Sequence, residues 1–226
     1  RAHRCNSMGA VTLRAPAKLN LYLHITGRRA DGYHLMESFV AFTQLADELT
    51  VEVSEDLSLH VAGEFANEAG NSDSNLVLKA ARALQAHTGC SKGAALTLTK
   101  NIPVGAGLGG GSADAAAALR GLNTLWHLGL SDEALHGIAV TLGADVPMCL
   151  ASMPAIARGI GDELQPLDTP LPMLHALLVH PRTALLTKDV YVAFARLPVP
   201  QAAPALLAYA DAASFLVALQ LMRNHL

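Results

Sequence analysis

The sequence has few cysteines and none in a C-x-x-C pair, since Cys5, Cys90 and Cys149 lie far apart among its 226 residues. This spacing argues against a disulfide framework and against a zinc site, and it suits a reducing cytoplasm. The 10 histidines include no H-E-x-x-H pair and no cluster with metal-ligand spacing. We therefore expect a cytoplasmic protein in which no residue is assigned as a metal ligand.

Charged residues and long apolar runs are also scarce. Only 15% of the residues are charged, the net charge is −3, and no basic stripe of the kind that binds nucleic acid is present. No apolar run reaches the roughly 18 residues of a membrane span. The first seven residues, RAHRCNS, lack the apolar core of a secretory signal and are left out of the expected fold. Neither nucleic acid nor a membrane is expected as a partner.

The most distinctive stretch runs from Pro103 to Leu119, PVGAGLGGGSADAAAAL. Its five glycines can adopt positive φ and let a ligand approach the backbone, because no Cβ intervenes. An alanine-rich helix follows directly, and Ser112 or Asp114 is expected to cap it. Backbone N–H groups and the positive end of a helix dipole then converge on one spot, which suits a phosphate chain. Anion binding is favoured over a flexible linker, because linkers rarely lead straight into a strong helix.

Neither of the common nucleotide loops fits this stretch well. Gly105, Gly107 and Gly110 match G-x-G-x-x-G, but a dinucleotide fold places the first glycine directly after a strand and an acidic residue about 20 positions later. Here residues 100–103 separate the glycines from the strand-like AALTLT, and Asp132 is typical of a helix cap. The G-x-x-x-x-G-K-[ST] loop is absent, because no lysine follows the glycines. A nicotinamide-dependent oxidoreductase is therefore a weak alternative.

The hydrophobic pattern predicts a mixture of strands and helices, class α+β. We expect strands over 19–25, 94–99, 146–151 and 174–181, and a strand pair over 47–53 and 57–61. We expect helices over 75–85, with Ser74 or Asn75 as its cap, over 112–126 and 132–143, from about Thr187, and in the alanine-rich tail. Residues 62–74 and 154–172 have the composition of loops and turns. The change in composition near 152–158 suggests two domains.

Two further segments carry candidate site residues. In the strand ending at Ile25, Lys18 and Asn20 share the face opposite the leucines. Pro16 in the same segment suits an edge strand or a strand break. Tyr33 and His34 follow a predicted turn at 29–32. They could stack on and hydrogen-bond a flat ligand, or they could be half-buried packing.

Three segments, in this order and spacing, resemble the GHMP kinase superfamily: PAKLNLYLHITGRRADGYH, PVGAGLGGGSADAAAAL and LGADVP. The combination AKLNL…GYH is similar to the branch whose substrate is a cytidyl compound. Over 15–226 this resemblance implies ATP- and Mg²⁺-dependent phosphorylation of the 2-hydroxyl of 4-diphosphocytidyl-2-C-methyl-D-erythritol, giving the 2-phosphate and ADP in non-mevalonate (MEP) isoprenoid biosynthesis. It also implies an ATP-binding domain over 8–154, similar to domain 2 of ribosomal protein S5, and a ferredoxin-like domain over 155–226.

The resemblance implies roles for residues far apart in the sequence. Asp145 would take the proton from the substrate hydroxyl, while the charge of Lys18 would keep that aspartate ionised and stabilise the transferred phosphoryl group. Asn20 would face the same site. The cytidine would bind between two aromatic rings, with His34 hydrogen-bonding its edge. The residues implied in the cytidine pocket are Tyr33, His34, Thr187 and Tyr191.

The ATP site is implied in the same way. Ser112 is placed near Mg²⁺, and Asn75 and Lys100 on the adenine side. The triphosphate would lie on Pro103, Gly105, Ala106, Gly107, Leu108, Gly109, Gly110, Gly111 and Ser112.

The sequence departs from the superfamily pattern in one respect, because the third, glycine-rich G-S-G-A-like motif is absent. We therefore expect the C-terminal domain to lack its end. Two alternatives stay open: a sister kinase acting on mevalonate, homoserine or galactose, and a nucleotide-binding module without catalysis. The expected state is a monomer or a weak homodimer.

Overall fold

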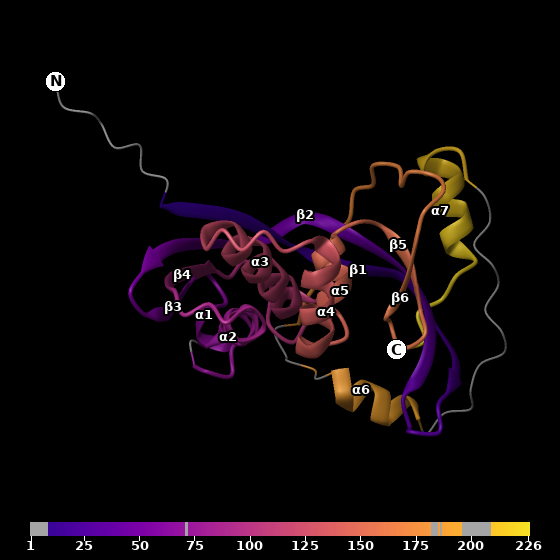
Figure 1. Cartoon of the computed structure of the whole chain (residues 1–226). Coiled ribbons are helices and arrows are strands. Elements are labelled where there is room, and N and C mark those ends of the chain that lie inside the picture. The colour runs from indigo at the N-terminus through magenta and orange to yellow at the C-terminus, as the bar shows by residue number, and fades with distance from the viewer. Residues whose placement is uncertain (1–8, 71, 182–184, 186, 196–208) are drawn as a thin grey trace. The chain divides into compact units, whose positions relative to one another are not determined.

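The computed structural model describes residues 9–70, 72–181, 185, 187–195 and 209–226. The expected mixture of strands and helices is confirmed (Figure 1). The strands are β1 (Ala10–Arg28), β2 (His34–Ser54), β3 (Leu57–Ala62), β4 (Gly93–Thr99), β5 (Ala155–Arg158) and β6 (Glu163–Pro166). The helices are α1 (Ala66–Ala69), α2 (Leu76–Thr88), α3 (Gly110–Leu125), α4 (Asp132–Leu142), α5 (Val146–Ala151), α6 (Thr187–Phe194) and α7 (Ala212–Gln220).

The chain forms two compact units that alternate along the sequence. Unit 1 contains the chain up to Ala17, Gln44–Val104 and Gly110–Leu150. Unit 2 contains Lys18–Thr43, Gly105–Gly109 and the chain from Ala151 onward. The long strands β1 and β2 therefore each contribute residues to both units. The expected domains, 8–154 and 155–226, stay a prediction.

In unit 1, β4 lies between β2 and β3. It pairs antiparallel with β2, where Val51 is opposite Leu96, and parallel with β3. The expected pairing of 47–53 with 57–61 is therefore wrong, although both segments are strands. A parallel pair needs a crossover connection. Helix α2 lies in the connection between β3 and β4, so β3 pairs with the strand that follows the helix and not with β2.

The core of unit 1 lies between its sheet and its helices. Helices α2, α3 and α4 contact one another, and α2 also contacts β3 (Figure 1). Helix α3 approaches the sheet closely at Gly121, where a Cβ would lie 2.7 Å from Leu13 and 3.2 Å from Val51. The small alanines of α3 permit the same approach, and Ala113 and 115–118 are buried. The alanine-rich composition thus makes α3 a central helix.

In unit 2, β5 pairs antiparallel with β2, and β5 and β6 form a hairpin. The sequence predicted only turns over 154–172, so this hairpin was missed. Gly159 and Gly161 have φ values of 67° and 104°, which make the tight turn possible. The Asp162 carboxylate closes the turn by accepting a 3.0 Å hydrogen bond from the Ile160 N–H.

The core of unit 2 is aromatic. Phe39 of β2 meets Phe215 of α7 edge to face, with ring centroids 5.5 Å apart. Tyr22 of β1 and Met222 belong to the same buried cluster. Beyond α7, the chain forms a parallel bridge with β1 at Leu23. Residues far apart in the sequence therefore complete one core.

Two strands that the sequence predicted in the second half of the chain are not formed. VPMCLA is helix α5 and not a strand. A short run of apolar residues has no periodicity that would tell a helix from a strand. No strand forms over 174–181, where Leu177 and Val179 are 89% and 85% exposed. Helices are confirmed from Thr187 and, in the tail, over 212–220. The first seven residues and the tail over 196–208 lie outside the described residues.

Candidate functional site

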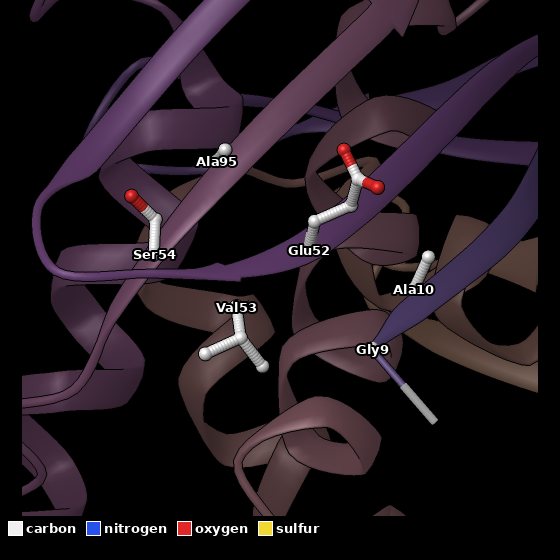
Figure 2. Close-up of a pocket in the computed structure, with 6 residues that line it drawn as sticks. All are labelled: Gly9, Ala10, Glu52, Val53, Ser54 and Ala95. Carbon is white, nitrogen blue, oxygen red and sulfur yellow. The ribbon is translucent and has the colours of Figure 1, made fainter. Parts of the chain in front are cut away.

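A pocket of about 430 Å³ in unit 1 contains none of the predicted site residues. It is lined by Gly9, Ala10, Glu52, Val53, Ser54 and Ala95 (Figure 2). Glu52 is the only charged residue among these six, and a small-molecule site normally has several convergent polar groups. The predicted site residues lie instead on the glycine loop and elsewhere in the two units.

The glycine loop connects β4 to α3, as the sequence predicted. Gly105, Gly107 and Gly109 have φ values of 70°, 73° and 65°, in the left-handed region. A residue with a Cβ is strained in this conformation, so glycine suits these three alternating positions. Gly110 begins α3, so the loop leads directly into a helix N-terminus. This is the geometry of backbone anion sites.

The expected cap of this helix is wrong. Because α3 begins at Gly110, Ser112 and Asp114 both lie within the helix and not at its N-cap. Ser112 is half-buried in the first turn, whereas Asp114 is only 3% exposed. The carboxylate of Asp114 faces Lys100 and not the free N–H groups of the helix.

In unit 2, two hydrogen bonds hold the tip of the glycine loop. The main-chain N–H of Lys18 on β1 donates to the Leu108 carbonyl at 2.8 Å. The N–H of Leu185 donates to the Gly105 carbonyl at 3.3 Å. The loop tip is therefore bound to the same residue that the sequence predicts as the catalytic lysine.

Lys18 and Asn20 lie on the same face of β1, as predicted from their spacing. The Lys18 ammonium donates a 3.0 Å hydrogen bond to the Asn20 amide oxygen. Lys18 is 6% exposed. Burial of an ammonium group is costly unless it is hydrogen-bonded. The contact with Asn20 is thus part of what allows Lys18 to be buried.

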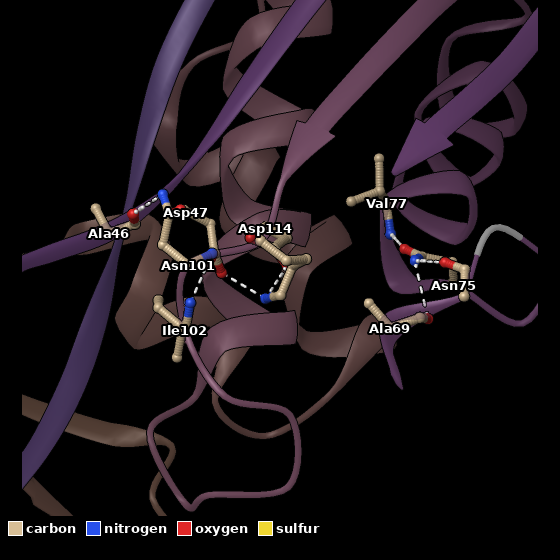
Figure 3. A network of polar contacts seen from close by, with 10 residues as sticks. Ala46, Asp47, Ala69, Asn75, Val77, Asn101, Ile102 and Asp114 are labelled. Carbon is tan, nitrogen blue, oxygen red and sulfur yellow. Dashed lines mark hydrogen bonds and ion pairs between the residues drawn. The ribbon is translucent and has the colours of Figure 1, made fainter. Parts of the chain in front are cut away.

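In unit 1, Lys100 is at the centre of a buried ionic network. Its ammonium donates to the Asp114 carboxylate at 2.8 Å and also to Asp47. The other oxygen of Asp47 accepts hydrogen bonds from the main-chain N–H groups of Asn101 and Ile102, at 2.6 and 2.8 Å. Figure 3 shows Asp47, Asn101, Ile102 and Asp114 together. The network joins β2, the start of the glycine loop and α3.

The network places two carboxylates beside one ammonium. Burial and the nearby charge of Asp47 raise the pKa of Asp114 to about 7, although Lys100 opposes the shift. The second oxygen of Asp114 has no hydrogen-bond partner within the described structure. Sequence reasoning assigned Lys100 to the adenine side and did not find its two partners. A buried lysine needs an opposite charge, and Asp114 in a run of buried alanines was the available signal.

Gly110 lies directly over the Lys100 ammonium. A Cβ on Gly110 would lie 3.2 Å from Lys100 Nζ and 3.1 Å from Ile102 Cγ2. Glycine at this position is therefore favoured by close packing and not by a positive φ. The absence of a side chain here lets the first turn of α3 pack closely against the ionic network.

Asn75, one of the two expected residues, is the N-cap of α2. Its side-chain oxygen accepts from the Val77 N–H at 2.9 Å, and its amide nitrogen donates to the Gly70 carbonyl at 2.9 Å (Figure 3). The capping geometry is confirmed. A contact of Asn75 with adenine stays a prediction.

The predicted cytidine pocket involves the β1–β2 turn and α6 of unit 2. The rings of His34 and Tyr191 lie 5.3 Å apart, and the Phe194 ring meets His34 edge to face at 5.7 Å. Tyr33 is 61% exposed at the turn. His34 and Tyr191 are thus brought together, while the ring of Tyr33 has a face open to solvent. The side chain of Thr187 lies outside what the structure describes.

Asp145 lies immediately before α5 in unit 1. Its carbonyl accepts the N–H of Cys149 at 3.1 Å, which is the first hydrogen bond of that helical turn. The residue is half-buried. Lys18 belongs to unit 2, so the pairing of Lys18 with Asp145 stays a prediction.

Within the described ranges, no group of three or more acidic, histidine or cysteine side chains could hold a metal ion. In the same part of the chain, none of the helices is long and apolar enough to cross a membrane.

Comparison with known proteins identifies the family. Residues 75–152 match the model described as GHMP kinases N terminal domain. Over all of its length, the chain is 43% identical to the 4-diphosphocytidyl-2-C-methyl-D-erythritol kinase of Rhizobium johnstonii and covers 75% of that protein. The chain belongs to the 4-diphosphocytidyl-2-C-methyl-D-erythritol kinase family. The superfamily expected from the three sequence segments is confirmed.

Two other members of this kinase family are similarly close. The chain is 48% identical to the enzyme of Paramagnetospirillum magneticum, over 82% of the chain and 65% of that enzyme. It is 50% identical to the enzyme of Alcanivorax borkumensis, over 80% of the chain and 60% of that enzyme. The chain therefore spans less than two thirds of the length of these two relatives.

Solved structures confirm the two-domain GHMP kinase fold. A crystal structure of a 4-(cytidine 5'-diphospho)-2C-methyl-D-erythritol kinase has a TM-score of 0.64 at 38% identity, covering 81% of this chain and 64% of that one. The homoserine kinase of Cytophaga hutchinsonii has a TM-score of 0.55 at 17% identity, covering 86% of this chain and 68% of that one. The second likeness is one of fold alone.

Proposed function

We propose that the protein transfers the γ-phosphoryl group of ATP to the 2-hydroxyl of 4-diphosphocytidyl-2-C-methyl-D-erythritol, giving ADP and the 2-phosphate. The observation that carries the proposal is the hydrogen bond from the Lys18 N–H to the Leu108 carbonyl. This contact supports the proposal because Lys18 is the predicted catalytic lysine and Leu108 belongs to the predicted phosphate loop. The family relationship supplies the substrate class.

The residues of the glycine loop fit a triphosphate. Three left-handed glycines leave the backbone open to a ligand, and the first turn of α3 offers N–H groups that have no partner within the helix. Ser112, half-buried in that turn, would lie near Mg²⁺, which would add positive charge to the phosphates. Asn75 and Lys100 are proposed on the adenine side. ATP and Mg²⁺ are therefore the proposed co-substrate and metal.

The proposed chemistry needs a base and a cation. Asp145 would accept the proton of the substrate hydroxyl as the oxygen attacks the γ-phosphorus. Lys18, with Asn20 beside it, would stabilise the negative charge on the transferred group. An ionised aspartate is a weak base, so positioning and electrostatic stabilisation would supply most of the acceleration.

The cytidine end would bind at the β1–β2 turn. Tyr33 has an exposed ring that can stack on a base, and His34 can hydrogen-bond the edge of that base. Thr187 and Tyr191 of α6 are proposed on the same pocket. The pocket would distinguish this substrate from mevalonate, homoserine and galactose, which carry no base to stack. A cytoplasmic location and a monomeric or weakly dimeric state stay predictions.

The test is ATP-dependent phosphate transfer to 4-diphosphocytidyl-2-C-methyl-D-erythritol by the wild type and by Asp145→Asn. We expect transfer by the wild type, and a loss of most turnover in the variant with ATP affinity retained. ATP binding without transfer to any of the four acceptors would support the non-catalytic nucleotide-binding module. Transfer to mevalonate, homoserine or galactose alone would identify a sister kinase. A variant with near wild-type kcat would remove Asp145 from the role of base.

A further inference from the structure

Ser38 lies near the start of β2, in the part of that strand that pairs with β5. It is fully buried, and its main chain is opposite Ala157 of β5 in the antiparallel ladder. β2 also pairs with β1. Pairing with β5 and β1 restrains the strand, so the hydroxyl of Ser38 has a defined place within unit 2.

The hydrogen bonds of Ser38 have a defined direction. Its hydroxyl oxygen lies 2.6 Å from the Tyr22 carbonyl, which can only accept, so Ser38 donates its one hydrogen there. Its lone pair must therefore accept the 2.6 Å hydrogen bond from the Asn20 amide nitrogen. This assigns the two ends of the Asn20 amide without ambiguity: the nitrogen faces Ser38, and the oxygen faces away from it.

The orientation of the Asn20 amide determines which of its atoms faces the Lys18 ammonium. The amide oxygen accepts the 3.0 Å hydrogen bond from the Lys18 ammonium, which can only donate. A flipped amide would present two hydrogens to the ammonium and repel it. Together with the main-chain bond to Leu108, this fixes Lys18 at both ends of the residue.

We propose that Ser38 is a positioning residue for phosphoryl transfer: it orients the Asn20 amide, and through it the Lys18 ammonium. The proposal rests on the proposed function, because it assumes that Lys18 acts on the transferred group. Ser38 itself contacts neither the substrate nor the phosphates in this role. Its hydroxyl acts through two successive hydrogen bonds.

The first test is the steady-state kinetics of Ser38→Ala. We expect kcat to fall by roughly 10- to 100-fold, because a misplaced catalytic group costs about that much. The KM values for ATP and for the cytidyl substrate should stay within about twofold, since Ser38 binds neither. Ser38→Thr keeps the hydroxyl and should retain most of the wild-type kcat. Ser58→Ala, at an exposed position on β3, is the matched control and should behave as wild type.

A double-mutant cycle separates positioning from general damage. If Ser38 acts through Lys18, then Ser38→Ala should have little further effect on kcat in a Lys18→Met background. An equal fall in kcat in both backgrounds would overturn the proposal, and so would an unchanged kcat in Ser38→Ala alone.

A measurement on the wild type needs neither activity nor a stable variant. The side-chain amide of Asn20, assigned by NMR, should have one hydrogen protected from solvent exchange by the bond to Ser38. A freely exchanging Asn20 amide would overturn the proposal. If the wild type has no transfer activity while this hydrogen is protected, the proposed function fails and the hydrogen-bond assignment stands.

Discussion

Lys100, the residue after β4, donates a 2.8 Å hydrogen bond to Asp114 of α3, and the Lys100 and Asp114 side chains are 3% and 4% exposed. Removing Lys100 leaves Asp47 and Asp114 buried without a cation. We therefore expect Lys100→Met to lower the free energy of unfolding by about 3–5 kcal/mol. Urea denaturation measures the change. Lys79→Met, an exposed position on α2, is the control and should change stability by no more than about 0.5 kcal/mol.

Asp114 should also make stability depend on pH. Its pKa rises from 3.8 to about 7 on folding. Between these values the folded protein holds a proton that the unfolded chain releases. The contribution of this group is therefore complete below pH 3.8 and is lost as the pH rises through about 7.

The comparison with Asp114→Asn isolates this effect. The difference in free energy of unfolding, wild type minus variant, should fall with rising pH in this window, by at most about 1.4 kcal/mol per pH unit. Subtracting the variant cancels the contribution of the histidines, which titrate in the same range. A difference that grows with pH would contradict the raised pKa.

Two neighbouring glycines should respond in opposite ways to the same substitution. Gly110→Ala would place a Cβ 3.2 Å from the Lys100 ammonium, which two carboxylates hold in place. We expect a loss of about 1–3 kcal/mol in stability, as for other overpacked sites. Gly111→Ala would place its Cβ at 3.6 Å from Leu76, an ordinary contact, and should stabilise α3 by about 0.5–1 kcal/mol. Equal changes in the two denaturation midpoints would count against the close-packing argument.

Replacing Tyr33 should raise KM for the cytidyl substrate but not KM for ATP. Tyr33→Ala removes an exposed ring, and base–aromatic stacking is worth about 1–3 kcal/mol. We expect KM for the cytidyl substrate to rise by roughly 5- to 150-fold, which is that energy expressed as a ratio, with KM for ATP unchanged. Tyr33→Phe keeps the stacking surface and is the control. A similar rise in both KM values would rule out the stacking role.

The sequence predicted those features that depend on neighbouring residues. The cap of α2 at Asn75 and the change from glycine loop to helix at Gly110 follow from local chemistry, and both were correct or within a few residues. The family segments then supplied the candidate residues Lys18 and Asp145, which are distant in sequence and which no local pattern could join.

Features that depend on distant partners were missed. Asp114 is a residue type that often caps helices. Here it is buried, because it accepts a hydrogen bond from Lys100, which lies 14 residues before it. The pairing of β3 with β4 was missed because the partner strand comes after a helix. The hydroxyl of Ser38 gave no signal, since its role depends on Asn20 and Tyr22 of another strand.

The alternation of the two units along β1 and β2 limits how the chain can be divided or recombined. A fragment ending at residue 154 would keep Tyr22 and Phe39 but lose Phe215 and Met222, which complete their core. The exposed aromatic surface would then favour aggregation over folding. Exchange of a C-terminal half between GHMP kinases therefore requires matched aromatic residues on β1 and β2. Recombination within this family should succeed only where those strands are inherited together with the second half.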